Sequence, residues 1–366
     1  MDAAINRISA VITNQTGKAQ HQNTLAFCVD NNYLPFAIFV ANQFIDHHSP
    51  LPCDICICMP DISQVPKALL TGTIRFIEMA ITGIDHMPVG SLSLAAYYRL
   101  FLPSIFAQTY DYIIYLDADT YINRPFYDDM MACCAQFPSN FCVAAAADII
   151  ELKFKSTMKP TAKKVDHYVR GYHQFDHVYR NSGVLLLNTK NYNHQQVLIK
   201  VFSYAFTHAD KLQCHDQSAL NGALLNDIVL LPFNFNWQIH TLTYKLTQEF
   251  NPYILHFISN NKPWVLKNKF TKDYQSIYHN YLVNNFPKQT PQVLNVYEYR
   301  KKSPKYSNPA REFISIKGHQ LRDGLAAISK TFSISANQGY GCQKILPTPP
   351  FLVSKDIKPQ IANKKE

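Results

Sequence analysis

The sequence predicts an α/β protein built on a largely parallel sheet. Short apolar segments of strand length alternate along the chain with segments whose apolar residues recur at helix spacing. The 366 residues, of which 47% are hydrophobic and 13% aromatic, can form a sizeable core, and this composition excludes a disordered chain. In sheets of this kind the ligand crevice lies at the carboxyl ends of the strands.

The individual elements follow from runs of apolar residues bounded by polar or turn residues. Five segments are expected to be buried strands, namely residues 24–30, 53–59, 110–117, 141–148 and 182–188. Three segments are expected to be helices, namely residues 32–46, residues 93–107 and a segment that begins at residue 215.

Nine cysteines, an odd number, favour a reducing compartment. The segment CDICICMP places Cys53, Cys56 and Cys58 close together, but a zinc site requires four ligands and the segment alternates like a strand. We therefore expect a strand with buried thiols. The chain shows no secretory signal and no apolar run of membrane-spanning length, which predicts a cytoplasmic protein.

Three regions are expected from composition. Residues 1–23 are polar and unpatterned and read as a flexible leader, residues 24–285 as the folded domain, and residues 286–366 as a proline-containing basic tail. Residues 299–366 hold 13 Lys or Arg and 4 Asp or Glu, which accounts for the whole net charge of +9. Such a tail is expected either to bind an anionic surface, such as lipid head groups or nucleic acid, or simply to be solvated.

Aspartates stand at the ends of three predicted strands. Asp30 ends the first, Asp117 and Asp119 end the third, and Asp148 ends the fourth. Because two neighbouring carboxylates repel each other, a positive partner is expected beside Asp117 and Asp119, either an arginine or a metal ion. The Asp-x-Asp pair can bind Mg²⁺ or Mn²⁺, although Asp119 can equally cap a turn.

A second interpretation of LDADT remains open. The segment also resembles the Asp-x-Asp-x-Thr motif of haloacid-dehalogenase-type phosphatases, in which the first aspartate is the nucleophile. Those enzymes carry the motif on the first strand, whereas here about a hundred residues of organised sequence precede it. A non-catalytic nucleotide-sugar-binding protein is a third possibility. A nucleic-acid binder is not expected, because residues 1–298 are neutral overall.

Other polar groups accompany these aspartates. Each has an ordinary structural explanation, such as a turn, an N-cap or a core histidine. Their combination with Asp30, Arg99 and the Asp-x-Asp pair instead indicates a site. The groups are Asn181 and Gly183 before a strand, Asp216 and Gln217 at a helix start, and His256 and Lys262 around a loop.

The chain resembles the retaining glycosyltransferases of family 8, which include bacterial lipopolysaccharide galactosyl- and glucosyltransferases and glycogenin. The resemblance covers residues 24–285 and depends on seven short motifs in the family's order. They are FCVDNNYLP, AAYYRLFLP, YDYIIYLDADT, NSGVLLLN, HDQSALN, LPFNFNW and HFISNNKPW.

The resemblance implies a GT-A fold, a Rossmann-like nucleotide-diphospho-sugar transferase fold with a mixed, mostly parallel sheet. It also implies a UDP-glucose or UDP-galactose donor and a glycan or lipid-linked acceptor. The metal, Mn²⁺ or Mg²⁺, is expected on Asp117, Asp119 and His256. Donor binding is expected from Asp30, Asn32, Tyr33, Arg99, Asn181, Ser259 and Lys262, and catalysis from Gln217, Asp216 and Asp148.

Three details complete this expectation. The resemblance assigns Gln217 to the face of the sugar where its carbonyl stabilises the transition state, with front-face attack by the acceptor. The family usually has glycine three positions after the histidine, and this chain has Ser259 there. A positive φ at that serine would be strained. The basic tail is expected to hold the enzyme near the inner face of an anionic membrane.

Overall fold

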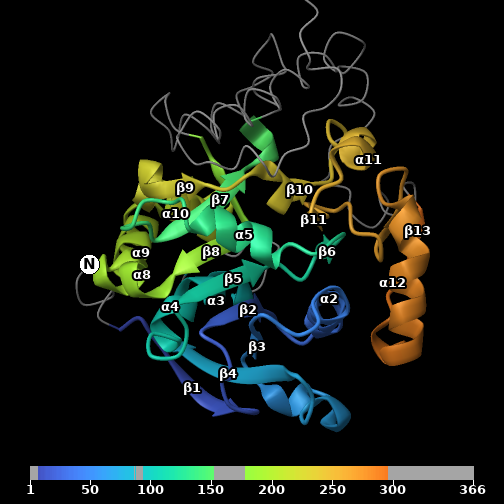
Figure 1. The fold of residues 1–366 in the computed structure, drawn as a ribbon, viewed down its shortest axis with the longest axis horizontal. Coiled ribbons are helices and arrows are strands. Elements are labelled where there is room, and N and C mark those ends of the chain that lie inside the picture. Colours follow the sequence, from blue (N-terminus) through green and yellow to red (C-terminus); the bar gives the residue numbers. More distant parts are fainter. Residues whose placement is uncertain (1–6, 86, 88–93, 152–177, 296–366) are drawn as a thin grey trace, which may run out of the picture.

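A mixed sheet of eight strands is the centre of the fold (Figure 1). The computed structural model describes residues 7–85, 87, 94–151 and 178–295. The strand order is β1-β4-β3-β2-β5-β8-β7-β9. The strands are β1 (Ser9–Gln15), β2 (Asn23–Cys28), β3 (Asp54–Met59), β4 (Ile74–Thr82), β5 (Tyr112–Leu116), β7 (Val143–Ala147), β8 (Arg180–Asn188) and β9 (Ile228–Leu230).

Most of these strands run in one direction. β4, β3, β2 and β5 pair in parallel, as do β7 and β9, whereas β1 and β8 are antiparallel to their neighbours. The predicted α/β class with a mixed, mostly parallel sheet is confirmed. The carboxyl ends of β2, β5 and β7 therefore meet at one rim, and the amino end of the antiparallel β8 reaches the same rim.

Helices cover both faces of the sheet. Because successive side chains of a strand point to opposite faces, Leu25 and Phe27 of β2 belong to one hydrophobic cluster and Ala26 and Cys28 to the other. The first face is covered by α2 (Leu34–His47) and α5 (Tyr127–Cys134), and α12 (Lys272–Asn285) packs against α2 within the same cluster. The second is covered by α3 (Ala95–Tyr98), α4 (Leu102–Ile105), α8 (Thr189–His194), α9 (Val197–Thr207) and α10 (His215–Leu224).

A small second sheet joins the segment just after β5 to two strands that come much later in the chain. Its order is β10 (Trp237–Gln238), β11 (Ile254–His256) and β6 (Thr120–Ile122). In the antiparallel pairing of β11 with β6, His256 lies opposite Thr120, which places it next to Asp119. α11 (Thr247–Phe250) precedes β11, and the short strands β12 (Leu266–Lys267) and β13 (Leu294–Asn295) pair beyond it.

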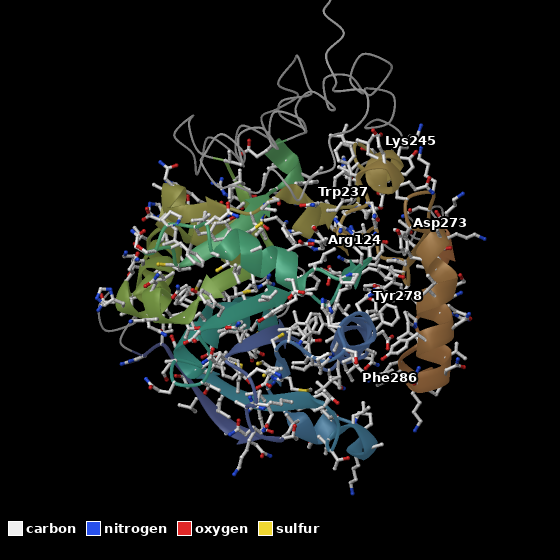
Figure 2. The ribbon with its side chains drawn as sticks, viewed as in Figure 1. Arg124, Trp237, Lys245, Asp273, Tyr278 and Phe286 are labelled. Atoms are coloured by element: carbon white, nitrogen blue, oxygen red, sulfur yellow. The ribbon has the colours of Figure 1, made fainter. Side chains whose placement is uncertain are left out.

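Helix α12 closes against this second sheet. Tyr278 points from α12 toward α2 (Figure 2), where its ring centroid lies 4.5 Å from that of Phe39. Its hydroxyl donates to the carbonyl of Thr120 at 3.0 Å. Each buried aromatic side chain contributes about 2–3 kcal/mol, so α12 stabilises the turn that carries Asp117 and Asp119.

Two expectations from the sequence are corrected. The predicted leader, residues 1–23, contains β1, which pairs antiparallel with β4 at the sheet edge. The helix expected at 93–107 is divided into α3, a 3₁₀ segment (Arg99–Phe101) and α4. The physical reason is Pro103, which lacks the N–H that would bond to Arg99 in a continuous helix.

The expected strand of buried thiols is confirmed. Cys53, Cys56 and Cys58 are buried and unpaired by disulfide, and β3 contains the last two. Within the described ranges, no helix has the length and apolar character needed to cross a bilayer. The basic segment 299–366 lies outside the described residues.

Candidate active site

The turn between β5 and β6 carries the two central aspartates. The backbone N–H of Asp117 donates to the carbonyl of Gly183 at 2.8 Å, which fixes the end of β5 against β8. Thr120 donates its backbone N–H and its hydroxyl to the carbonyl of Asp117, at 3.1 and 2.8 Å. These bonds hold Asp117 and Asp119 at the rim of the sheet.

Arg99 is the positive partner of Asp117. Its Nη2 lies 2.9 Å from Asp117 Oδ1 and its Nε lies 3.2 Å from Asp216 Oδ2. Nη1 donates to the carbonyl of Ser182 at 2.8 Å. The guanidinium lies 4.6 Å from the Tyr115 ring centroid, and the Tyr115 hydroxyl donates to Asp117 at 2.6 Å. Burial disfavours this charge, but Asp117 and Asp216 raise the pKa of Arg99 above its ordinary value.

Asp119 has a different set of partners. Its Oδ1 lies 3.1 Å from His256 Nε2, and its Oδ2 accepts a hydrogen bond from Lys262, which also donates to the carbonyl of Phe257. Burial alone would raise the pKa of Asp119, but the Lys262 ammonium holds it well below its ordinary range. Asp119 is therefore a carboxylate at neutral pH.

Asp117, Asp119 and His256 form a group that could hold a metal ion. Their ligand atoms all lie within 4.8 Å of one another, and His256 Nε2 is 3.8 Å from Asp117 Oδ2. Asp119 Oδ1 is buried and faces His256 Nε2 at 3.1 Å, but no group among the residues described makes an aligned hydrogen bond to it. An orphaned buried oxygen is unfavourable by about 1–3 kcal/mol, and a divalent cation between the three groups would satisfy it. The donor set fits Mn²⁺ or Mg²⁺.

A chain of amides lines the rim beside this group. Asp148 follows β7, and its Oδ2 accepts hydrogen bonds from Asn181 Nδ2 at 2.9 Å and from Gln217 Nε2 at 3.1 Å. Gln217 Oε1 accepts the backbone N–H of Ser182 at 3.1 Å. The structure thus brings together a residue that follows β7, a residue of β8 and a residue of α10.

Asp216 lies beneath this rim and is almost completely buried. Desolvation raises its pKa to about 6, although Arg99 acts in the opposite direction. Its Oδ2 accepts a hydrogen bond from the Ser182 hydroxyl at 3.3 Å. Asp216 therefore contacts Arg99 and β8 directly.

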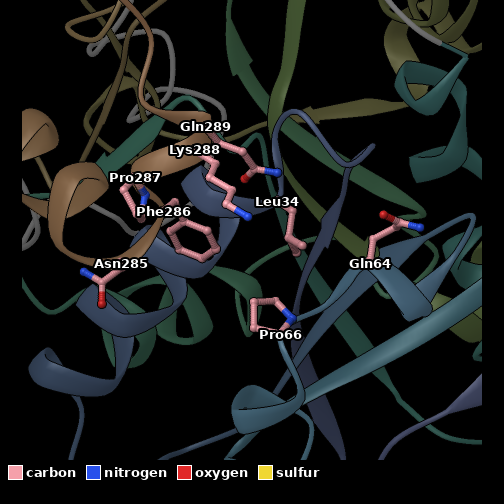
Figure 3. A pocket seen from close by; sticks show the side chains of 8 residues that line it. All are labelled: Leu34, Gln64, Pro66, Asn285, Phe286, Pro287, Lys288 and Gln289. Carbon is pink, nitrogen blue, oxygen red and sulfur yellow. The ribbon is translucent and has the colours of Figure 1, made fainter.

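The nucleoside-binding candidates lie at the end of β2. Asp30 Oδ1 accepts the backbone N–H groups of Asn32 and Tyr33 at 3.0 and 3.2 Å, which shapes the turn into α2. Asn32 is exposed, and Tyr33 is 39% exposed. A pocket of about 330 Å³ lies between Leu34 of α2 and Phe286 after α12, with the Lys288 side chain pointing into it (Figure 3).

Ser259 lies on the exposed loop after β11. Its φ is +55°, in the left-handed region that glycine adopts without strain. The serine therefore stands where the resemblance led us to expect glycine.

Three contributors to this arrangement were not identified from the sequence. Tyr115 and Ser182 contact Arg99, and Asn236 contacts His256. Asn236 lies in the motif LPFNFNW, but spacing along the chain does not indicate which side chain of such a segment meets a histidine from another strand.

Solved structures share this fold. The galactosyltransferase LgtC, crystallised with donor and acceptor sugar analogs, is similar over 71% of this chain and 95% of its own, with a TM-score of 0.54 and 18% identity. The bifunctional glycosyltransferase WbbM is similar over 75% of this chain and 51% of its own, with a TM-score of 0.50 and 18% identity. The chain therefore shares the fold of these two structures.

The chain belongs to glycosyl transferase family 8, whose sequence model matches residues 24–267. General stress protein A of Bacillus subtilis (strain 168) is 26% identical over 227 residues, which are 57% of this chain and 72% of that protein. Glycosyltransferase GlyE of Streptococcus pneumoniae is 30% identical over 94 residues, 23% of each chain. The protein is a glycosyltransferase, and the phosphatase interpretation of LDADT is wrong.

Proposed function

We propose that this glycosyltransferase moves glucose or galactose from a UDP-sugar to a glycan or lipid-linked acceptor, as in lipopolysaccharide synthesis, with retention of configuration and with Mn²⁺ or Mg²⁺ as cofactor. The observation that carries the proposal is the orphaned Asp119 Oδ1, which faces His256 Nε2 at 3.1 Å beside Asp117. Family membership supports a nucleotide-sugar donor and a glycan acceptor.

In this proposal the donor extends from the end of β2 to the rim amides. Tyr33, which is partly exposed, stacks on the uracil, an interaction of about 1–3 kcal/mol. Asp30 uses Oδ1 for its own turn, and its Oδ2 together with Asn32 binds the nucleoside. Ser259 and Lys262 bind the diphosphate.

The leaving group is an anion, and fixed positive charge around it lowers the barrier. Asp117, Asp119 and His256 would hold the metal ion, which supplies positive charge to the diphosphate when bound. Lys262 exchanges its bond with Asp119 for one with the diphosphate, whose oxygens carry more charge. Arg99 donates to Asp117, Asp216 and Ser182, so we assign it to holding the carboxylates that face the donor.

The sugar fragment becomes oxocarbenium-like as its bond to phosphate breaks, and nearby oxygens stabilise it. Asp148 and the Gln217 carbonyl are the groups proposed to face it, with Asn181 fixing Asp148. Asp216 does not face the sugar but holds Arg99 in position. Front-face attack by the acceptor then gives retention.

The test is UDP release from a panel of UDP-sugars with and without Mn²⁺. Release from UDP-glucose or UDP-galactose that requires Mn²⁺ and is lost in Asp119→Ala is expected. The matched control is Asp61→Ala, which removes a partly exposed carboxylate that caps a 3₁₀ turn and should release UDP normally. If UDP does not bind at all, the proposed donor site is wrong.

We also propose a cytoplasmic enzyme that associates with anionic membrane through residues 299–366. The support is the excess of basic residues in that segment. Removing residues 299–366 should abolish binding to anionic liposomes. Unchanged liposome binding would contradict this part of the proposal.

A further inference from the structure

A chain of hydrogen bonds joins His256 to Gln217 behind the rim. His256 Nδ1 lies 2.9 Å from Asn236 Oδ1, and Asn236 Nδ2 donates to Asn181 Oδ1 at 2.8 Å. Asn181 Nδ2 donates to Asp148, which also accepts from Gln217. The chain thus connects the proposed metal site with the proposed sugar site.

Two backbone N–H groups determine how the side-chain amides in this hydrogen-bonded series are oriented. The N–H of Gly183 donates at 3.0 Å to the side-chain atom of Asn181 that faces Asn236, so that atom must be the oxygen. The Asn236 atom that faces it is consequently the nitrogen, and Asn236 turns its oxygen to His256. At the other end the N–H of Ser182 fixes the oxygen of Gln217 in the same way.

The orientation of the Asn236 amide determines which ring nitrogen of His256 carries a hydrogen. An amide oxygen can only accept, so Nδ1 of His256 carries a hydrogen, and in the neutral ring the lone pair is on Nε2. Nε2 is the atom that faces Asp119 at 3.1 Å and Asp117 at 3.8 Å. A metal-binding imidazole commonly donates its other N–H to such an acceptor.

We propose that Asn236, a fully buried residue, is a positioning residue with two separable functions. Its oxygen orients His256 so that Nε2 points to the two carboxylates, and its nitrogen, through Asn181, fixes Asp148 and Gln217. The inference rests on the proposed function for the metal and the sugar, but the hydrogen position on His256 can be measured without either.

The first measurement is which ring nitrogen of His256 carries a hydrogen in the metal-free protein, determined by NMR of ¹⁵N-labelled histidine. The signal is assigned by its absence in His256→Gln. A hydrogen on Nδ1 is expected. A hydrogen on Nε2 alone would overturn the proposal, whatever the activity of the enzyme.

The second measurement separates the two functions by direct Mn²⁺ binding in the presence of UDP, using calorimetry. Asn236→Ala should weaken Mn²⁺ binding about 10- to 100-fold. Asn236→Asp keeps an acceptor for His256 but cannot donate to Asn181. It should therefore bind Mn²⁺ within a few-fold of the unchanged protein and lose kcat, with little change in KM for the donor.

The matched control is Asn234→Ala. Asn234 lies two residues away and is equally buried, and its side-chain amide has no hydrogen bond among the described residues. This variant should bind Mn²⁺ normally even if its melting temperature falls. If Asn234→Ala weakens Mn²⁺ binding as much as Asn236→Ala, or if Asn236→Ala binds normally, the positioning function is refuted. Absence of Mn²⁺ binding in the unchanged protein would instead contradict the proposed metal site.

Discussion

Gly183 and His256 are in such close contact that no side chain fits between them. A Cβ on Gly183 would lie 2.2 Å from Cε1 of His256, 2.7 Å from its Nδ1 and 2.9 Å from Asp117 Oδ2. Real Cβ atoms do not approach other atoms so closely. The glycine is therefore required because two groups of the proposed metal site pack directly on β8.

Gly183→Ala should abolish Mn²⁺ binding. The methyl group must displace His256 or Asp117, and overpacking of this kind destabilises the fold by about 1–3 kcal/mol. Mn²⁺ binding by calorimetry and the free energy of unfolding in urea are the two measurements. In the control Gly72→Ala the nearest atom is a carbonyl oxygen at 3.5 Å, so both quantities should be nearly unchanged. Normal Mn²⁺ binding by Gly183→Ala would contradict this packing argument.

Arg99→Lys tests the buried pairing of Arg99 with Asp117 and Asp216. Lysine has a single ammonium and cannot reproduce the forked contacts of the guanidinium. Breaking a buried pair leaves an uncompensated charge and destabilises by about 3–5 kcal/mol. We expect lower stability together with weaker binding of Mn²⁺ and UDP, measured by urea unfolding and calorimetry.

The control for Arg99 is Arg75→Lys. Arg75 is also buried and lies 3.8 Å from Asp54, at the amino ends of β4 and β3 and therefore at the opposite end of the strands from the active-site rim. It donates to Gln15 at 3.0 Å. This variant should lose stability and retain Mn²⁺ and UDP binding. Loss of binding in both variants would indicate a general effect of unfolding rather than a role of Arg99 at the site.

The rim of the sheet could be predicted from the sequence because it depends on local patterns. Apolar runs that end in Asp30, Asp117 and Asp148 identify strands, and the parallel arrangement brings their carboxyl ends together. The group of Asp117, Asp119 and His256 is brought together in the structure as the resemblance implied.

The remaining contacts depend on tertiary structure that local patterns do not encode. β6 and β11 have three residues each, too few for a periodic signal, yet their pairing carries His256 to Asp119. β1 is a mostly exposed edge strand, so its polar composition does not distinguish it from a flexible leader. The direction of the Asn236 amide is set by the backbone of another strand.

Asp216→Asn should change how stability depends on pH. The pKa of Asp216 is about 6 in the folded protein and near the ordinary value of about 3.9 when unfolded. Between these values the folded state binds the extra proton, so stability falls as pH rises from about 4 to 6. Asp216→Asn does not show this decrease in the free energy of unfolding, which amounts to at most about 3 kcal/mol.

The measurement is the free energy of unfolding of both proteins from about pH 4 to pH 7. The difference between Asp216→Asn and the unchanged protein should grow across this interval in favour of the variant. Asp210→Asn removes an exposed carboxylate and should follow the unchanged protein throughout. A constant difference for Asp216→Asn would show that Asp216 titrates normally in the folded state.

Ser259→Gly should relieve strain at a left-handed position. Because φ is +55°, the serine has a backbone conformation that glycine adopts freely, and the change should raise the free energy of unfolding by up to about 1 kcal/mol. Gln196 has the same φ of +55° at the start of α9. The control Gln196→Gly should have a similar effect on stability and none on UDP binding.

UDP affinity decides what Ser259 contributes to the proposed donor site. If the backbone N–H of Ser259 donates to the phosphate, Ser259→Gly retains that donor and should bind UDP within about threefold of the unchanged protein. Losing a hydrogen bond to the phosphate would weaken UDP binding by more than this. Ser259→Val should bind UDP more weakly, because a β-branched residue is unfavourable at positive φ and would shift the loop. A marked loss of UDP affinity in Ser259→Gly would mean that the serine hydroxyl, which glycine cannot replace, is the group that binds the phosphate.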